Sequence, residues 1–180
     1  MPDSEPLEIE AASARRVHVA AAQPLAKLRV QSWYGATNVP LLSFPVGSSG
    51  DGEVRVLRIG PSEWLAVSET LDAAGLALQV LAKLCAAGAA GNFALVDMTD
   101  GLQVVEIHGP AARELLETGC CLDLHPGHFP VGRCTRTRLA GLPVLIDCNG
   151  PVERFQLYVA RSYVAWFTAW LIDASLDLGR

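Results

Sequence analysis

Short segments of alternating apolar and polar residues, separated by glycine and proline turns, are the feature of this sequence that most restricts its fold. Val54–Ile59 alternates and is followed by the turn Gly60-Pro61 and by Trp64–Val67, a pattern that predicts a β-hairpin. Leu25–Trp33 alternates in the same way. Further strands are expected at Phe93–Asp97, Gln103–His108, Thr135–Leu139, Val144–Asp147 and Phe155–Val159. Strand pairs interleaved with few helices predict an α+β fold, in which helices pack on a mainly antiparallel sheet.

The length and composition predict one folded domain preceded by a tail. The chain has 180 residues, of which 51% are hydrophobic. This length suits a single domain with a substantial core. Residues 1–14 are acidic and are expected to form a disordered tail, which leaves residues 15–180 as the domain. The glycine- and serine-rich segment Gly47–Gly52 is expected to be a loop.

The charge of the chain bears on its partners. Fourteen basic and nineteen acidic residues give a net charge of −5. This balance argues against a nucleic-acid partner, because phosphate binding needs clustered Lys and Arg. Only 18% of the residues are charged, against about 25% in an average protein. We therefore expect another protein to cover part of the surface.

Nothing in the sequence predicts export or a membrane span. The first residues lack the basic and then apolar pattern of a secretory signal. Gln79 and Lys83 interrupt the apolar segment Leu76–Leu84, and the apolar segment Tyr163–Ile172 is too short to cross a bilayer. The five cysteines are an odd number without the spacing of a disulfide scaffold. We expect a cytoplasmic protein.

The first predicted helix runs from an N-cap at Thr70 to about Ala87, with Asp72 in its first turn. Its only polar positions are Asp72, Gln79 and Lys83, which form one narrow stripe. We therefore expect most of the circumference of this helix to be buried.

The last helix, from Ser162 to about Leu178, carries no charge over its first eleven residues. One apolar stripe with helical spacing is expected to face the sheet: Tyr163, Trp166, Phe167, Trp170, Leu171 and Ala174. The opposite face is also uncharged and comprises Val164, Ala165, Thr168, Ala169 and Ile172. Either the helix is buried inside its own domain or a partner covers the second face. Because a terminal helix of a small domain usually forms a surface layer, we expect these five residues to be a partner interface.

The densest group of potential metal ligands lies between residues 120 and 134. It comprises Cys120, Cys121, His125, His128 and Cys134. Their spacing matches none of the usual zinc patterns, and adjacent cysteines rarely bind one ion. A metal site and ordinary loop or core residues are both possible interpretations, and we expect the second, with no metal ligand.

No catalytic or cofactor-binding residue is predicted. His108 ends a strand just before a helix, Pro110–Glu117, but no second catalytic group is placed beside it. Asp147 likewise has no second catalytic group predicted beside it. Asp97 and Asp100 are typical of a turn that is stabilised by hydrogen bonds from side chains to the backbone. The sequence contains neither a phosphate-binding glycine loop nor the nucleophile motif G-x-S-x-G.

The order of several segments resembles the gamma subunit family of heterotetrameric sarcosine oxidase. The most specific is G-C-C-L-D-L-H-P-G-H-F-P-V-G at Gly119–Gly132. The other matching segments are Arg58–Val67, Val96–Asp100, Val105–Leu116, Thr135–Thr137 and Arg161–Tyr163. This family is similar in fold to the aminomethyltransferase (T-protein) of glycine cleavage, with which it shares the strand, G-P-x-A and helix unit seen at Gly109–Ala112.

The resemblance implies a non-catalytic structural subunit that works with alpha, beta and delta subunits. In that family the alpha and beta subunits hold FAD, FMN, NAD and the tetrahydrofolate site, and the delta subunit holds zinc. The whole complex demethylates sarcosine oxidatively to glycine, forming hydrogen peroxide and methylene-tetrahydrofolate. The resemblance implies no cofactor and no catalytic residue in the chain described here.

Two other interpretations remain open. The chain could be a stand-alone folate-binding one-carbon transferase or regulator related to T-protein, or an interaction domain on the same scaffold. Active aminomethyltransferases place an acidic residue where this chain has the apolar segment Gly141–Val144, and Asp147 is out of phase with that position. The length of 180 residues also leaves no room for the further domains of a typical T-protein.

Overall fold

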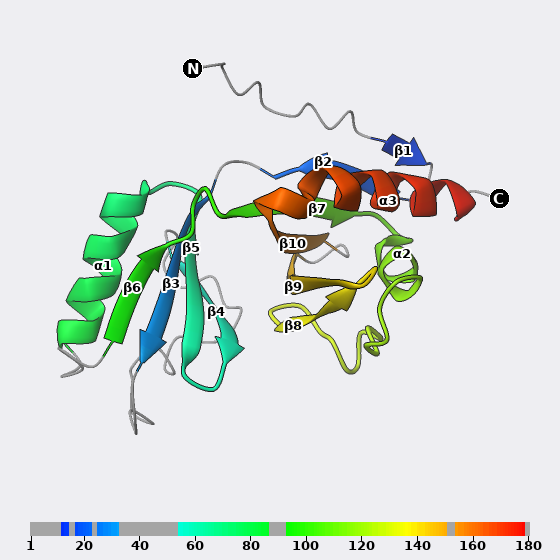
Figure 1. Cartoon of the computed structure of the whole chain (residues 1–180). Coiled ribbons are helices and arrows are strands. Elements are labelled where there is room, and N and C mark those ends of the chain that lie inside the picture. The colour runs from blue at the N-terminus through cyan, green and yellow to red at the C-terminus, as the bar shows by residue number, and fades with distance from the viewer. Residues whose placement is uncertain are drawn as a thin grey trace, which may run out of the picture.

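The structure is a computed structural model that describes residues 12–14, 17–22, 25–32, 54–86, 93–150 and 154–178. In this part of the chain the strands form two antiparallel sheets (Figure 1). One sheet has the order β1(Ala12–Ala14), β2(Val17–Ala21), β7(Leu102–His108), β10(Arg154–Ala160), β9(Leu142–Gly150), β8(Cys134–Leu139). The other has the order β4(Arg55–Gly60), β5(Glu63–Ser68), β3(Ala26–Ser32), β6(Phe93–Asp97). We call them the six-stranded and the four-stranded sheet.

Three α-helices in the described ranges cover the outer faces of these sheets, and the predicted α+β fold is confirmed. Helix α1(Ala73–Ala86) packs on the four-stranded sheet, while α2(Ala112–Glu117) and α3(Val164–Asp177) pack on the six-stranded sheet (Figure 1). The inner faces of the two sheets meet in a third apolar layer, to which Leu57, Leu65, Leu145 and Tyr158 contribute. The order of layers is therefore helix, sheet, sheet, helix.

The two sheets share a strand order, and in the six-stranded sheet one position of that order is filled by β2, from near the start of the chain. The order β4-β5-β3-β6 corresponds to β9-β10-β7-β2, and in each case a helix follows the second strand of the order, α1 after β5 and α3 after β10. The strand that would follow α3 is supplied by β2, from the other end of the chain. Because β2 pairs with β7, it covers an edge that would otherwise expose unpaired backbone groups.

The beginning of the chain differs in part from the expected tail. Residues 1–11 of that tail, like the loop expected at Gly47–Gly52, lie outside the described residues. Residues Ala12–Ala14 form β1, which pairs with β2. The expected start of the domain, residue 15, therefore comes directly after a strand. Backbone hydrogen bonds pair β1 with β2 and do not depend on apolar side chains, so the sequence pattern did not predict this strand.

Helix α1 departs from its prediction at its start and in its burial. It begins at Ala73, and the cap is Asp72, whose Oδ1 accepts a bond of 2.8 Å from the backbone of Gly75. The expectation that most of its circumference is buried is wrong. Only the stripe Leu76, Val80 and Leu84 is buried, and Leu78 is 68% exposed. One buried stripe suffices to anchor a helix on a sheet, so the other sides of α1 face outward. No helix among the described residues has the length and apolar character needed to span a bilayer.

The end of α2 lies against α3 at Gly119, which leads to a first prediction. A Cβ atom added at Gly119 would lie 2.6 Å from Cη2 of Trp170. Because the indole is packed against the core, we expect Gly119→Ala to lower the free energy of unfolding by about 1–3 kcal/mol, as overpacking does. The control is Gly101→Ala, whose added Cβ would approach no atom closer than 3.5 Å and which should change it by less than about 0.5 kcal/mol. Urea unfolding followed by circular dichroism measures both, and equal effects would contradict the packing argument.

Candidate functional site

Helix α3 is rotated relative to its prediction. Its buried residues are Val164, Phe167, Thr168, Leu171 and Ser175. Val164 and Thr168, expected to face a partner, are only 6% and 7% exposed because they pack on this chain's own sheet. Trp166, expected to face the sheet, is 54% exposed. The prediction failed in its phase, since the first turns of this helix carry uncharged residues all round and the first exposed charge of the helix comes only at Asp173.

The outward side of α3 is nevertheless largely apolar, although Asp173 and Asp177 near its end are exposed. We call it the outer face of α3 and define it by Ala165, Trp166, Ala169, Ile172 and Leu176. Trp166 and Leu176 are more than half exposed, and Ile172 is partly buried. Three of the five residues expected at a partner interface, Ala165, Ala169 and Ile172, belong to this face. Hydrophobic exposure on this scale is typical of residues that meet another protein.

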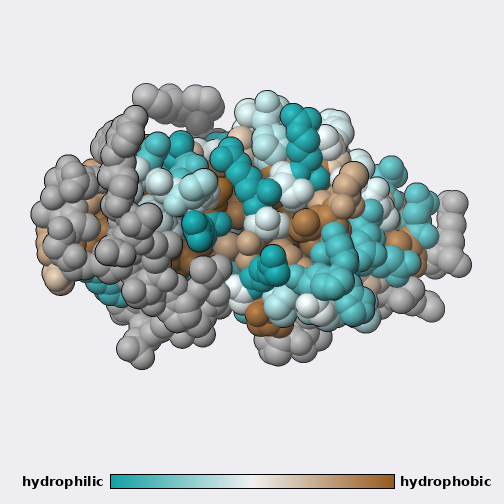
Figure 2. All heavy atoms as spheres, turned by 90° about the horizontal axis from the view of Figure 1, so that it is seen from below, coloured by the Kyte–Doolittle hydropathy of each residue, from teal (hydrophilic) through white to brown (hydrophobic). Residues whose placement is uncertain are grey.

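The opposite side of the molecule has a different character. Figure 2 shows the side seen from below, where the brown residues among those drawn in colour form several small areas separated by teal ones. Scattered exposed apolar residues of this kind are ordinary on a protein surface. The outer face of α3 is therefore the better candidate for a contact surface.

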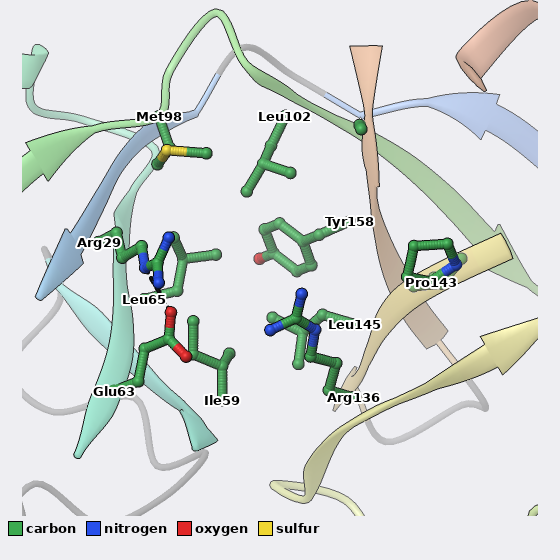
Figure 3. Close-up of a pocket in the computed structure, with 12 residues that line it drawn as sticks. Arg29, Ile59, Glu63, Leu65, Met98, Leu102, Arg136, Pro143, Leu145 and Tyr158 are labelled. Carbon is green, nitrogen blue, oxygen red and sulfur yellow. Dashed lines mark ion pairs between the residues drawn. The ribbon is translucent and has the colours of Figure 1, made fainter. Parts of the chain in front are cut away.

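A cavity of about 160 Å³ lies between the two sheets. Its walls are mainly apolar and include Leu65 from the four-stranded sheet, Leu145 and Tyr158 from the six-stranded sheet, and Leu102 at the start of β7 (Figure 3). Burial raises the pKa of the Tyr158 phenol, and its hydroxyl donates a bond of 2.9 Å to Oε1 of Gln156. The phenol is therefore a neutral wall of the cavity at physiological pH.

Three charged side chains also line this cavity. Arg29 on β3 forms an ion pair with Glu63 on β5, and Arg136 on β8 reaches in from the other sheet (Figure 3). Among the described residues Arg136 has neither a hydrogen bond nor an ion pair. The cavity thus has one guanidinium in excess of its carboxylates.

A buried ion pair joins the two sheets nearby. The carboxylate of Asp147 on β9 is fully buried and accepts a bond of 2.5 Å from the guanidinium of Arg55 on β4. Burial raises the pKa of Asp147 to about 6, although Arg55 acts in the opposite direction. Burial likewise raises the pKa of the neighbouring Cys134 thiol to about 11. Asp147 is thus engaged in contact between the sheets.

The cysteines and histidines between residues 120 and 134 have structural contacts. Among the described residues no three His, Cys, Asp or Glu side chains gather to hold a metal ion. His128 pairs with Asp123 through Nδ1, and Nδ1 of His125 accepts a bond of 3.1 Å from the backbone of Gly127. Cys120 is buried, whereas Cys121 is exposed. The histidines stabilise turns of this segment.

One arginine holds this segment against the domain. Arg113 on α2 donates to the carbonyl groups of Leu124 and Phe129, the second at 3.1 Å. Its guanidinium also lies 5.1 Å from the ring centroid of Phe155, a cation–π distance. Since Leu124 and Phe129 are themselves buried, the segment is fixed by its side chains and by its backbone.

The remaining candidate acids, Asp97 and Asp100, lie in one turn before β7, and His108 lies at the other end of that strand. Asp97 accepts a bond of 2.8 Å from the backbone of Thr99, so the predicted turn is confirmed. The side chain of Thr99 and, to a lesser extent, this backbone bond lower the pKa of Asp97. Asp100 is exposed, 3.9 Å from Arg161. His108 stacks on His18 of the neighbouring strand, with ring centroids 4.9 Å apart. The structure does not bring His108 together with the two acids.

Comparison with known proteins decides the family. The model of the sarcosine oxidase, gamma subunit family matches residues 20–177. The chain belongs to this family. Sarcosine oxidase subunit gamma of an Arthrobacter species is 34% identical over 142 residues, and that of Corynebacterium sp. strain P-1 is 33% identical over 138 residues. These alignments cover 78% and 77% of this chain but 66% and 64% of the relatives, so the chain spans just under two thirds of their length.

One solved structure of a sarcosine oxidase is similar to this chain, and a more distant one shares its fold. A chain of heterotetrameric sarcosine oxidase from Corynebacterium sp. U-96, in complex with pyrrole 2-carboxylate, has a TM-score of 0.73 and 28% identity. The match covers 95% of this chain and 89% of that one. Aminomethyltransferase T from Bartonella henselae has a TM-score of 0.55 at 12% identity over 87% of this chain and 45% of its own. The second likeness shows the fold alone.

The gamma subunit resemblance rests on residues that the structure places in the scaffold. The segment Gly119–Gly132 is held by Arg113, and the Gly109–Ala112 unit begins α2. Sequence reasoning missed the cavity, Arg136 and the Asp147–Arg55 pair. Asp147 gave a signal, since it is an acid within an apolar strand, but nothing in the sequence connects it with Arg55.

Proposed function

We propose that this chain is a non-catalytic structural subunit of a heterotetrameric sarcosine oxidase, assembled with alpha, beta and delta subunits in the cytoplasm. The observation that carries the proposal is the likeness over almost the whole chain to a chain of the Corynebacterium heterotetramer. Membership in the gamma subunit family supports it. The polar residues that sequence analysis considered for catalysis support it too, since Asp97 and Asp147 are used in a turn and between the sheets.

The proposal assigns the redox chemistry to the partner subunits. FAD, FMN, NAD and the tetrahydrofolate site belong in the alpha and beta subunits, and zinc in the delta subunit. The complex as a whole then converts sarcosine to glycine and forms hydrogen peroxide and methylene-tetrahydrofolate. The gamma chain contributes a rigid surface, of which the outer face of α3 is the part that meets a larger subunit.

The contact surface is tested by Ala169→Glu, in the middle of the outer face of α3. We expect the variant to fold normally, because Ala169 is exposed in this chain. We expect it to weaken assembly at least about hundredfold, because a glutamate buried without a partner costs several kcal/mol and about 1.4 kcal/mol is tenfold. The measurement is co-purification and surface plasmon resonance of the tagged chain with the other subunits. Gln103→Glu, which adds the same charge at an exposed position of β7, serves as the control and should assemble normally.

The outcomes separate the surface from the function. If wild-type chain and Ala169→Glu assemble equally well, α3 is not the contact surface, although the subunit role stands. If the wild-type chain co-purifies with no sarcosine oxidase subunit from its host, the subunit role is wrong. Micromolar binding of tetrahydrofolate by the isolated chain in calorimetry would favour the one-carbon transferase instead.

A further inference from the structure

The apolar layer between the two sheets is incomplete at the cavity. Leu65, Leu145 and Tyr158 belong to this layer and also line the cavity, so the empty space continues the core. Its volume is about 160 Å³. An apolar cavity of about 150 Å³ is large enough to take up benzene. The space therefore suits a body about the size of one ring.

The charges at the cavity add a preference for an anion. Arg29 and Glu63 neutralise one another across neighbouring strands, while Arg136 lies on the opposite side, with no partner among the residues that the structure describes (Figure 3). A guanidinium binds a carboxylate through two parallel hydrogen bonds. The apolar walls strengthen such an interaction, because they lower the local dielectric constant.

The hydroxyl of Tyr158 does not compete for this role. Its proton is donated to Gln156, so it has no second proton for an anion. The side chain of Arg29 is 40% exposed and Arg136 is an exposed residue, so a carboxylate held between them keeps part of its hydration. The apolar body of a ligand would then lie inward, against Leu102 and Leu145.

We propose that this cavity binds a small organic carboxylate, whose ring-sized apolar body fills the space between the sheets while Arg136 holds the carboxylate. The site is independent of the outer face of α3 and goes beyond the subunit role. It gives the scaffold a ligand-binding position that can respond to the concentration of a small acid.

The test uses the purified full chain and two probes of the same shape. Benzoate carries the carboxylate, and benzamide replaces it with a neutral group. We expect saturable benzoate binding in calorimetry or NMR titration, at least about tenfold tighter than benzamide binding, as a charge-assisted contact implies. Arg136→Gln should weaken benzoate binding about tenfold and leave benzamide binding unchanged. The matched control is Arg138→Gln, two residues along β8, where the side chain bonds to the carbonyl of Gly141 outside the cavity.

A second variant tests the location. Ala160→Phe places a ring in the wall of the cavity and should abolish binding of both probes, with folding checked by circular dichroism. Three results would overturn the proposal: no saturable benzoate binding, equal losses from Arg136→Gln and Arg138→Gln, or unchanged binding in a folded Ala160→Phe chain. Since assembly is not measured, failure here leaves the subunit proposal intact.

Discussion

The Phe167→Ala variant is expected to lose about 3–5 kcal/mol of the free energy of unfolding, the usual cost of deleting a buried aromatic side chain. Phe167 is fully buried at the contact of α3 with the six-stranded sheet. Its ring centroid lies 6.4 Å from that of Trp170, with the planes nearly parallel. Removing the ring leaves a cavity that the surrounding strands cannot fill, because their positions are fixed by the sheet. Urea unfolding of the full chain measures the loss.

The neighbouring Trp166→Ala variant is the matched comparison. Its side chain is 54% exposed, so we expect the free energy of unfolding to change by less than about 1 kcal/mol. We expect the same variant to weaken assembly with the larger subunits, because exposed tryptophans often dominate interfaces. A loss of stability from Trp166→Ala equal to that from Phe167→Ala would contradict the orientation of α3.

Arg55→Met is expected to lower the free energy of unfolding by about 3 kcal/mol at pH 7.5. The substitution leaves the carboxylate of Asp147 buried without its partner. The loss should be smaller at pH 5, because the pKa of Asp147 is raised to about 6 and the carboxyl group is then protonated in the folded chain. Urea unfolding at the two pH values measures the difference, and a loss that does not depend on pH would contradict the pairing.

The sign of the wild-type pH dependence follows from the same group. The folded pKa of Asp147, about 6, lies above the ordinary value of 3.8. Its contribution to stability is therefore fully present below about pH 4 and is lost as the pH rises through 6, by about 3 kcal/mol. Asp147→Asn should remove this dependence. Because other acids also titrate, the contribution of Asp147 is measured as the difference between the wild-type and Asp147→Asn curves of unfolding free energy against pH.

A double substitution serves as the control for Arg55. In Arg55→Met with Asp147→Leu, no charge is left unpaired between the sheets, and apolar replacement of a buried pair is often neutral or stabilising. We expect the double variant to recover most of the stability that Arg55→Met loses. If it is as unstable as the single variant, packing of Arg55 and not charge is responsible.

The hairpins and their turns could be predicted from the sequence. The segment Val54–Val67 becomes β4 and β5, and the residues expected to form five later strands do so with shifts of a few positions. Such elements are local, because alternation and glycine or proline turns act within a few residues. The turn at Asp97 and the family resemblance could also be predicted from the sequence, since both depend on residues close together in the chain.

The orientation of α3, the pair Arg55–Asp147 and the cavity with Arg136 were decided only by the tertiary structure. Uncharged residues surround the first turns of α3, so its periodicity is compatible with more than one buried stripe, and contact with the sheet selects Val164, Phe167 and Leu171. Arg55 and Asp147 are 92 positions apart and meet because two sheets stack, which no local pattern specifies. The sequence determined which segments are strands and helices through short-range sterics and alternation; the stacking of the sheets determined which side chains face one another.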